Sequence, residues 1–444
     1  MNGARSKRFA AALLAAALLM ASPPAGAADN GAAESLNERI ARAKPGDTIV
    51  LAPGFYEGPV VIDRPLVLRS SGEGQAVLRN ESRQPALTVA SEDVTVAGLA
   101  IEDEARKEAP SVLVTGRGAW LHDLHVRTGS DGIAIRDADG VRVSGCVVEW
   151  APAGVRTADK GNGIDLFNAH GAELRGNVIR DVHDGIYIEN SDDVTVTGNR
   201  IENSRYGIHT MYANRTVIQG NYGQRNVTGA MVMAARNTEI SGNTFTKQSE
   251  NVHSQGLLLY DAHDTRVTGN LAEGNRVGFY VELSTNNVFA QNRILNNYMG
   301  LQLIEAENNL LTENLFAGNV AHALAKDSTA NNLDGNHWDT FRGLDTDGDG
   351  RSEMGYAINP FFQGLTAKRP AFQIFFQSPG MVFLEGLYQA DKGTWAMDGS
   401  PLMKRPETLR AGEGAADARQ TGLAGLILTS GAVLILIWAR RRDA

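Results

Sequence analysis

One stretch of 22 residues and its repetition decide the fold: Gly-Asn-Val-Ile-Arg-Asp-Val-His-Asp-Gly-Ile-Tyr-Ile-Glu-Asn-Ser-Asp-Asp-Val-Thr-Val-Thr (residues 176–197). Its opening Gly-Asn pair returns at residues 198, 220, 242 and 269, and Gln-Asn and Glu-Asn pairs take the same place at residues 291 and 313. The asparagines are 22 residues apart except for one step of 27. A fixed period in this range indicates a solenoid whose coils bury their apolar faces by stacking.

Each period alternates apolar and polar residues, as in residues 185–189 and 194–197, which is typical of strands and not of helices. About three short strands fit one coil, and hydrogen-bonded coils rise about 4.8 Å each. We therefore predict an all-β fold, a right-handed parallel β-helix with coils of about 22 residues. The repeated asparagines predict an internal ladder, because an amide side chain both donates and accepts hydrogen bonds. Cys146 takes the Asn position in the first repeat, and we expect it to be a small buried side chain.

The two ends of the chain predict export and anchoring. Residues 1–27 combine basic residues, an apolar run and Ala-Gly-Ala, the layout of a cleaved secretory signal. Residues 421–439 form an uncharged apolar run of 19 residues, about 28 Å long as a helix and close to a bilayer core. The arginine triplet 440–442 follows at once, so we expect a single C-terminal transmembrane helix with its tail in the cytoplasm. The β-helix then lies in the periplasm of a bacterial host, anchored to the inner membrane.

The remaining boundaries follow from composition, and a net charge of −9 makes nucleic acid a poor partner. The expected order is signal peptide 1–27, N-terminal cap and first strand 28–58, parallel β-helix 59–340, C-terminal capping region 341–410, linker 411–420, transmembrane helix 421–439 and cytoplasmic tail 440–444.

A second marker gives the register of the strands. A glycine opens one apolar strand in each coil, and the first and third residues after it are apolar, so they point inward. The second and fourth residues therefore point outward, and they are unusually apolar for a solvated face. Stacking places His209 and Met211 one coil from Met231 and Met233. We call the following set the His/Met patch: Tyr187, His209, Met211, Met231, Met233 and Tyr260.

Departures from the 22-residue period fall at one corner of the coil. Extra residues lie at 150–162 and 245–255, and both loops lead into the outward column that holds the His/Met patch. Insertions on one side of a repeat protein commonly mark its binding face.

The His/Met patch admits two interpretations. Thioether and imidazole ligands suit Cu(I), which predicts a transient copper site. An exposed apolar patch in which Met is the adaptable residue instead predicts a protein-docking surface. We favour docking, because His209 is the only strong ligand in the set and the other histidines are scattered over different coils.

Asp345-Thr-Asp-Gly-Asp-Gly (residues 345–350) matches the first half of a Ca²⁺-binding loop. Tyr356 stands where such a loop has its bidentate Glu, and Glu353 substitutes in part. The sequence favours a structural calcium site formed by Asp345, Asp347, Asp349 and Glu353 over an empty acidic turn, and both over a catalytic metal site.

We assign no catalytic residues. The outward column offers the carboxylates Asp165, Glu189 and Glu282, but they lie on different coils and have no obvious basic partner in the sequence. The alternative to a non-enzyme is a β-helix polysaccharide lyase or epimerase, or a carbohydrate-binding module. A carbohydrate-binding module would use Tyr187, Tyr260 and Tyr280 for stacking, but it leaves the membrane anchor unexplained.

With these residues in view, the mature chain resembles the NosD family of periplasmic nitrous oxide reductase maturation proteins. The resemblance rests on residues 46–56, the Gly-Asn repeats, the run 206–212 and Asn-His-Trp-Asp at 336–339 ahead of the acidic loop. It implies a non-enzymatic accessory protein that works with the membrane and ATPase subunits of an ABC transporter and helps assemble the copper–sulfur centre of nitrous oxide reductase. The chain has no P-loop, so ATP hydrolysis would belong to a partner.

Overall fold

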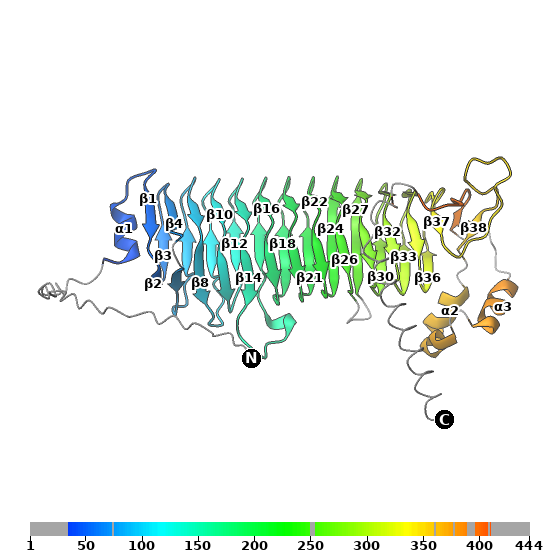
Figure 1. The fold of residues 1–444 in the computed structure, drawn as a ribbon, viewed down its shortest axis with the longest axis horizontal. Coiled ribbons are helices and arrows are strands. Elements are labelled where there is room, and N and C mark those ends of the chain that lie inside the picture. The colour runs from blue at the N-terminus through cyan, green and yellow to red at the C-terminus, as the bar shows by residue number, and fades with distance from the viewer. Residues whose placement is uncertain are drawn as a thin grey trace, which may run out of the picture. The chain divides into compact units, whose positions relative to one another are not determined.

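The computed structural model describes residues 34–72, 75–248, 254–358, 361–375, 378–388, 396–406 and 409. In these residues the chain winds through three parallel sheets, and each coil contributes one strand to each sheet (Figure 1). The predicted all-β, right-handed parallel β-helix is confirmed.

The first sheet consists of β1 (Thr48–Leu51), β4 (Val67–Ser70), β7 (Thr95–Ala97), β10 (Trp120–His122), β13 (Arg142–Ser144), β16 (Glu173–Arg175), β19 (Thr195–Thr197), β22 (Val217–Gln219), β25 (Glu239–Ser241), β28 (Arg266–Thr268), β31 (Val288–Ala290) and β34 (Leu310–Thr312). The second sheet consists of β2 (Gly54–Glu57), β5 (Ala76–Arg79), β8 (Leu99–Asp103), β11 (His125–Thr128), β14 (Val147–Trp150), β17 (Val178–Arg180), β20 (Arg200–Glu202), β23 (Tyr222–Gln224), β26 (Thr244–Thr246), β29 (Leu271–Glu273), β32 (Arg293–Leu295), β35 (Leu315–Ala317) and β37 (His337–Trp338).

The third sheet consists of β3 (Val60–Ile62), β6 (Leu87–Val89), β9 (Val112–Val114), β12 (Ile133–Arg136), β15 (Ile164–Phe167), β18 (Asp184–Glu189), β21 (Tyr206–Met211), β24 (Thr228–Arg236), β27 (Gln255–His263), β30 (Val277–Glu282), β33 (Met299–Ile304) and β36 (Ala321–Lys326). Outside the sheets lie α1 (Leu36–Arg42), η1 (Thr157–Asp159), α2 (Phe361–Lys368), η2 (Pro370–Phe375), α3 (Pro379–Leu387) and the short pair β38 (Tyr356–Ala357) and β39 (Met397–Asp398).

The asparagine ladder runs along the turn between the first and second sheets. Asn221 shows its bonding: its Oδ1 accepts hydrogen bonds from the backbone N–H of Asn199 at 2.8 Å and from Asn199 Nδ2 at 3.0 Å. Its Nδ2 donates to the backbone oxygen of Val196 at 2.9 Å and to Oδ1 of Asn243 at 3.0 Å. Because every buried turn must satisfy its backbone polar groups, the ladder joins each coil to the next.

The Gly-Asn pair has a backbone explanation. Gly176, Gly198, Gly220, Gly242 and Gly269 all have φ between 62° and 65°, a left-handed conformation that glycine adopts without strain. The glycines that open the strands of the third sheet have a different role: the absence of a side chain lets neighbouring coils pack against them closely. A Cβ on Gly185 would lie 2.3 Å from Ile201 Cγ2 and 2.6 Å from the backbone oxygen of Gly207.

The inward residues of all three sheets form one continuous apolar core. Cys146 is fully buried in it, as expected, and its backbone N–H donates to Asn177 Oδ1 at 2.9 Å. Burial raises the pKa of its thiol to about 12, so the sulfur behaves as a small apolar group.

Both ends of the stack are covered by other segments. At the N-terminal end α1, with a Ser35–Glu38 capping box, buries Leu36 and Ile40 in the core cluster. At the C-terminal end the ring of Trp338 stacks on Phe316 with centroids 4.2 Å apart. The buried Asp398 carboxylate then accepts hydrogen bonds from Trp338 Nε1 at 2.8 Å and from the backbone N–H of Asn336 at 2.9 Å, which ends the asparagine ladder.

The predicted signal peptide (1–27), linker (411–420), transmembrane helix (421–439) and tail (440–444) lie outside the described residues. Within the described residues, no helix combines the length and apolar character that crossing a membrane requires.

We predict that removing one ladder amide destabilises the protein strongly. In an Asn221→Ala variant, the backbone N–H and the side-chain amide of Asn199 lose their acceptor, and each buried unsatisfied donor costs about 1–3 kcal/mol. We expect urea denaturation of the full chain to show a loss of about 3 kcal/mol. Gln219→Ala, on the exposed face of the same coil, is the matched control and should change stability by less than about 0.5 kcal/mol. Equal stability of the two variants would contradict the structural role of the ladder.

Candidate functional site

The outer face of the third sheet carries the His/Met patch. The strand register places Tyr187 beside His209, His209 beside Met231, and Met211 beside Met233 on successive coils. Tyr260 pairs with Met233 one coil further on. The structure thus brings all six predicted patch residues onto four neighbouring strands.

The alternation predicted that His209 is exposed on this face. The structure shows that it is only 7% exposed. Its Nδ1 is 3.0 Å from the carboxylate of Asp184, at the start of the neighbouring strand β18. The rings of Tyr187 and Tyr206 approach it edge-on, each with its centroid 5.0 Å away. Its Nε2 is buried and has no hydrogen-bond partner in the described residues, which leaves one ring nitrogen as an unused donor or acceptor.

Asp184 holds this arrangement in place. Its buried carboxylate forms a bidentate ion pair with Arg205 at 2.8 and 2.6 Å and also bonds His209. Burial opposes its ionisation, but the hydrogen bonds from Arg205 and His209 outweigh burial and lower the pKa of Asp184 to about 2. Asp184 is therefore ionised at neutral pH and fixes the orientation of the imidazole, as carboxylates do for metal-binding histidines.

The three methionines lie on the same face as this histidine: Met231 pairs with His209 in register, and Met233 pairs with Met211. Met211, Met231 and Met233 are all partly exposed, whereas the inward residues between them, Thr210 and Val232, are fully buried. The structure therefore offers one buried imidazole nitrogen and three flexible thioethers on adjacent coils.

The carboxylates of this column are better paired than the sequence indicated. Asp165 is 6% exposed and forms an ion pair with Arg136 at 2.6 Å, so the expectation that it lacks a basic partner was wrong. The sequence did not indicate Arg136 as the partner, because it lies on the preceding coil and the insertion 150–162 separates it from Asp165. Glu189 and Glu282 each accept a hydrogen bond from a tyrosine on their own strand, Tyr187 at 2.9 Å and Tyr280 at 2.7 Å.

The outer face of the second sheet is different in character. Arg79, Glu102, Arg127, Glu149 and Arg180 follow one another in register on five successive strands. Oppositely charged neighbours pair with each other, as in Arg79–Glu102 at 2.7 Å and Arg180–Glu149 at 2.7 Å. Over these five strands the second sheet pairs its own charges, whereas the His/Met patch on the third sheet consists mainly of uncharged side chains.

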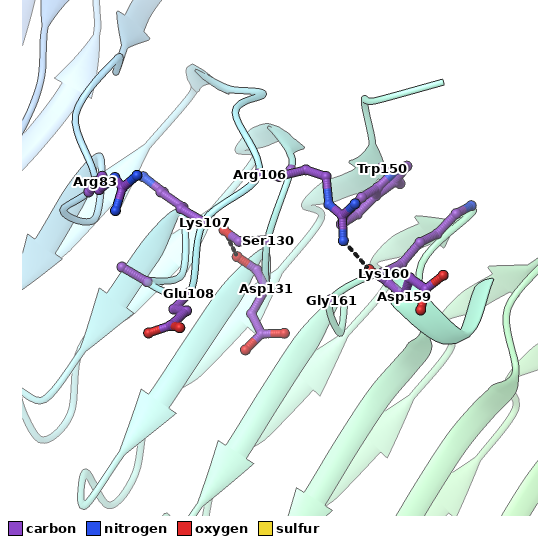
Figure 2. Close-up of a pocket in the computed structure, with 12 residues that line it drawn as sticks. Arg83, Arg106, Lys107, Glu108, Ser130, Asp131, Trp150, Asp159, Lys160 and Gly161 are labelled. Carbon is purple, nitrogen blue, oxygen red and sulfur yellow. Dashed lines mark hydrogen bonds between the residues drawn. The ribbon is translucent and has the colours of Figure 1, made fainter. Parts of the chain in front are cut away.

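A hollow of about 700 Å³ lies at the corner between the second and third sheets, just N-terminal to the patch (Figure 2). We call it the corner pocket. Its wall comes from loops that leave four successive coils, one of which is the predicted insertion 150–162. The pocket is lined by Arg83, Arg106, Lys107, Glu108, Ala109, Gly129, Ser130, Asp131, Trp150, Asp159, Lys160 and Gly161.

The sequence did not indicate this pocket, and it also missed two further amide ladders. Asn275, Asn297 and Asn319 stack at the second corner of the coil, and Asn287 and Asn309 stack at the third. Their spacing of 22 residues is the signal that could have revealed them. The second predicted loop, 245–255, lies partly outside the described residues.

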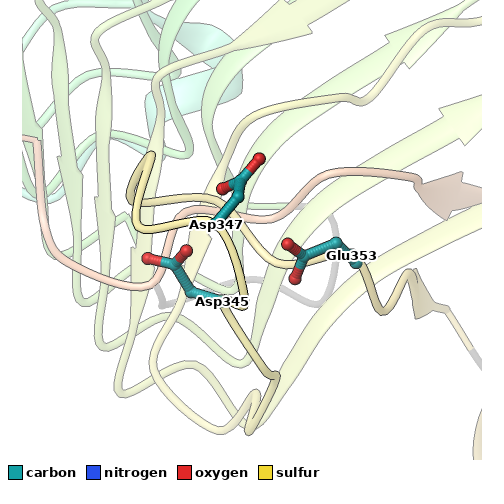
Figure 3. Close-up of side chains that lie close together, drawn as sticks. All are labelled: Asp345, Asp347 and Glu353. Atoms are coloured by element: carbon teal, nitrogen blue, oxygen red, sulfur yellow. The ribbon is translucent and has the colours of Figure 1, made fainter.

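The acidic loop brings together Asp345, Asp347 and Glu353, whose carboxylate oxygens lie within 4.8 Å of one another (Figure 3). Asp349 is not part of this group; its carboxylate instead accepts a hydrogen bond from the backbone N–H of Arg351 at 2.8 Å. Glu353 accepts from Thr346 N at 3.0 Å, and Asp345 accepts from Gly348 N at 2.7 Å. Three of the four predicted calcium ligands are thus neighbours, and the calcium site stays a prediction.

Comparison with known proteins identifies relatives over most of the chain. A family model described as "Periplasmic copper-binding protein (NosD)" matches residues 153–343, a range that contains the whole His/Met patch. A protein of Stutzerimonas stutzeri called "Probable ABC transporter binding protein NosD" is 33% identical over 80% of this chain and 86% of its own length. A protein of Pseudomonas aeruginosa PAO1 with the same name is 35% identical over 84% of this chain and 94% of its own length.

Solved structures resemble the chain in fold. A family 28 exopolygalacturonase of Yersinia enterocolitica superposes with a TM-score of 0.51 and 11% identity, covering 67% of this chain and 75% of the enzyme. The A-module of an Azotobacter vinelandii mannuronan C-5 epimerase gives a TM-score of 0.49 and 16% identity, covering 66% and 86%. At 11% identity the likeness to the exopolygalacturonase shows a shared fold alone.

We predict that Ca²⁺ stabilises the C-terminal region through the acidic loop. Bringing three carboxylates within 4.8 Å creates repulsion that a divalent cation relieves, and a ligand that binds the folded state raises its melting temperature. Adding CaCl₂ to metal-free protein should raise Tm by a few degrees, whereas an Asp345→Asn/Asp347→Asn variant should not respond. Asp192→Asn/Asp193→Asn, in a turn between strands, is the control and should respond as the wild type does. No change of wild-type Tm would refute the calcium site.

Proposed function

The chain belongs to the NosD family, and from this membership we propose that it is a non-enzymatic periplasmic accessory protein that works with an ABC transporter to mature the copper–sulfur centre of nitrous oxide reductase. The observation that carries the proposal is the outer face of the third sheet, where a carboxylate-oriented histidine and three methionines lie together inside the family-matched range.

We assign to the His/Met patch the role of docking the reductase. The second sheet pairs its own charges, whereas the third sheet presents Met231, Met233 and Tyr260, partly exposed side chains without charge. An apolar strip continues C-terminally through Leu258, which pairs with Met231. Contiguous apolar surface rimmed by polar loops is typical of protein-binding sites, and methionine adapts its shape to a partner.

The same patch fits copper as a cargo. His209 Nε2 is buried and unpaired, and Asp184 on Nδ1 fixes the ring as an outer-sphere carboxylate does for a ligating histidine. Imidazole and thioether donors suit Cu(I), so His209 with Met211, Met231 and Met233 would hold the ion. Because Nε2 is buried, an ion would reach it only after neighbouring side chains move apart.

Nothing in this face supports polysaccharide turnover as well as it supports docking. The buried carboxylates Asp165 and Asp184 are tied up in ion pairs with Arg136 and Arg205. Glu189 and Glu282 hold tyrosine hydroxyls. A lyase or epimerase needs an acid and a base that converge on one sugar. The four carboxylates of this face instead form ion pairs with arginines or accept hydrogen bonds from tyrosines.

Association with the transporter is supported by the C-terminal helices. On α3, Phe383 is 65%, Leu384 48% and Leu387 57% exposed, and Tyr388 directly after it is 37% exposed. So much apolar surface on one short helix fits contact with a transporter subunit or the inner membrane. The proposed transmembrane segment 421–439 would follow this region along the chain and anchor it.

We predict that substitution within the His/Met patch abolishes docking. In a His209→Ala/Met231→Asp variant, the patch loses its buried ring and gains a charge in an apolar contact. The full chain should then no longer co-purify with copper-free nitrous oxide reductase. The control Arg127→Ala/Arg180→Ala removes charges from the second sheet and should leave co-purification intact. Undiminished binding by the patch variant, or equal loss in the control, would exclude this surface.

We predict that the methionine sulfurs bind Cu(I). Replacing Met211, Met231 and Met233 by Leu retains apolar contact and removes three ligands, so stoichiometric Cu(I) binding should be lost in competition with a colorimetric chelator. Met354→Leu/Met397→Leu, at two methionines that are 54% and 55% exposed elsewhere, is the matched control and should bind as the wild type does. Equal uptake by the wild type and the triple variant would leave docking as the role of the patch.

A further inference from the structure

The corner pocket is built as a rigid site and is not an accidental gap between loops. The ammonium of Lys107 forms an ion pair with Asp103 at 2.6 Å, and the two side chains are 3% and 0% exposed. Lys107 Nζ also donates to the backbone oxygen of Gln84 at 2.6 Å, which ties the loop at 104–110 to the loop at 80–86. One wall of the pocket is therefore fixed by a buried ion pair.

Two glycines bring the loops close to the floor of the pocket. A Cβ on Gly129 would lie 2.4 Å from the backbone oxygen of Glu104, and one on Gly161 would lie 2.3 Å from the carbonyl carbon of Ser130. The indole N–H of Trp150 donates to the backbone oxygen of Pro152 at 2.8 Å, so the ring is held in place. The site is thus preorganised, which lowers the cost of binding a ligand.

Cationic side chains around the pocket have unused donors. Arg106 donates one hydrogen bond to the backbone oxygen of Asp159 at 3.4 Å, and Lys160 donates to the backbone oxygen of Asp181 at 2.6 Å. A guanidinium has five N–H donors and an ammonium three, so both groups keep capacity for a ligand. Arg83 is exposed at the opposite end of the pocket in the view of Figure 2, with Asp131 between.

Acceptors are interspersed with these donors. Glu108 is exposed, and the half-buried Asp131 accepts one hydrogen bond, from the backbone N–H of Asn162 at 2.7 Å. Ser130 adds a hydroxyl. A ligand whose polar groups are all anionic, such as polyglutamate or phosphate, would meet repulsion at Glu108 and Asp131, whereas the hydroxyl groups of a sugar would find acceptors there.

From this set we infer that the corner pocket binds an acidic sugar, with the carboxylate on Arg106 and Lys160, hydroxyls on Asp131 and Glu108, and a ring against Trp150. Alternating donors and acceptors beside one aromatic ring match a hydroxylated ligand, and paired cations match one carboxylate per unit. A hollow of about 700 Å³ has the size of ordinary small-ligand sites and accommodates a disaccharide. This binding is independent of the copper and docking roles of the His/Met patch.

The test is calorimetric titration of the full chain with digalacturonate, its dimethyl ester and hexaglutamate. We expect digalacturonate to bind, and the neutral ester to bind about tenfold or more weakly because it lacks the charge-assisted hydrogen bonds. The Arg106→Gln/Lys160→Gln variant should lose affinity by a similar factor. Arg127→Gln/Arg180→Gln, on the second sheet, should bind as the wild type does.

Two further measurements test the proposal independently of the double variant. Arg83→Gln removes the exposed cation at the opposite end of the pocket, where it would meet the second carboxylate of digalacturonate, and should weaken binding even if the double variant fails to fold, as judged by circular dichroism. Ligand-induced tryptophan fluorescence changes should disappear in Trp150→Phe. Absence of digalacturonate binding, equal binding of the ester, or preferential binding of hexaglutamate would each overturn the proposal. None of these results bears on copper binding by Met211, Met231 and Met233.

Discussion

The structure depends on one constraint: each buried turn of the coil must find hydrogen-bond partners for its backbone in the next coil. The amide side chains at the corners meet this requirement, because one oxygen accepts two hydrogen bonds and one nitrogen donates two. The constraint keeps successive strands in register, even where a coil has 27 or 31 residues in place of 22. It therefore also keeps the outward columns straight, and a functional patch can be assembled from residues a full period apart.

The same constraint explains how much the sequence could predict. The alternation after the marker glycines predicted which residues point inward and which point outward. The predicted register is confirmed for all six patch residues, which lie on neighbouring strands. The burial of His209 could not be predicted, because it depends on Asp184 and Arg205, which reach it from the corner and are not part of the alternation. The corner pocket was missed for a similar reason. Its walls are irregular loops of the early coils, where no Gly-Asn pair marks the register.

The outer faces of the second and third sheets differ in their chemistry. The second sheet neutralises its own charges in a column of alternating Arg and Glu, and such exposed pairs contribute little to stability. The third sheet, by contrast, combines apolar residues with one oriented imidazole, and the corner beside it carries the inserted loops. The features on which the proposed binding roles rest therefore lie on one side, while the core beneath them stays uniform.

The regular stack has a consequence for distance. Strands β24 and β36 are separated by four steps in the third sheet, so the patch lies about 19 Å from the last full coil, at about 4.8 Å per step. This separation changes by whole coils, because extra residues within a coil, such as the insertions at 150–162 and 245–255, form loops and leave the ladder intact. Distances along the axis of the β-helix are therefore multiples of the rise per coil, about 4.8 Å. Evolution can lengthen or shorten the reach of such a protein in units of one coil, while the chemistry at the patch stays the same.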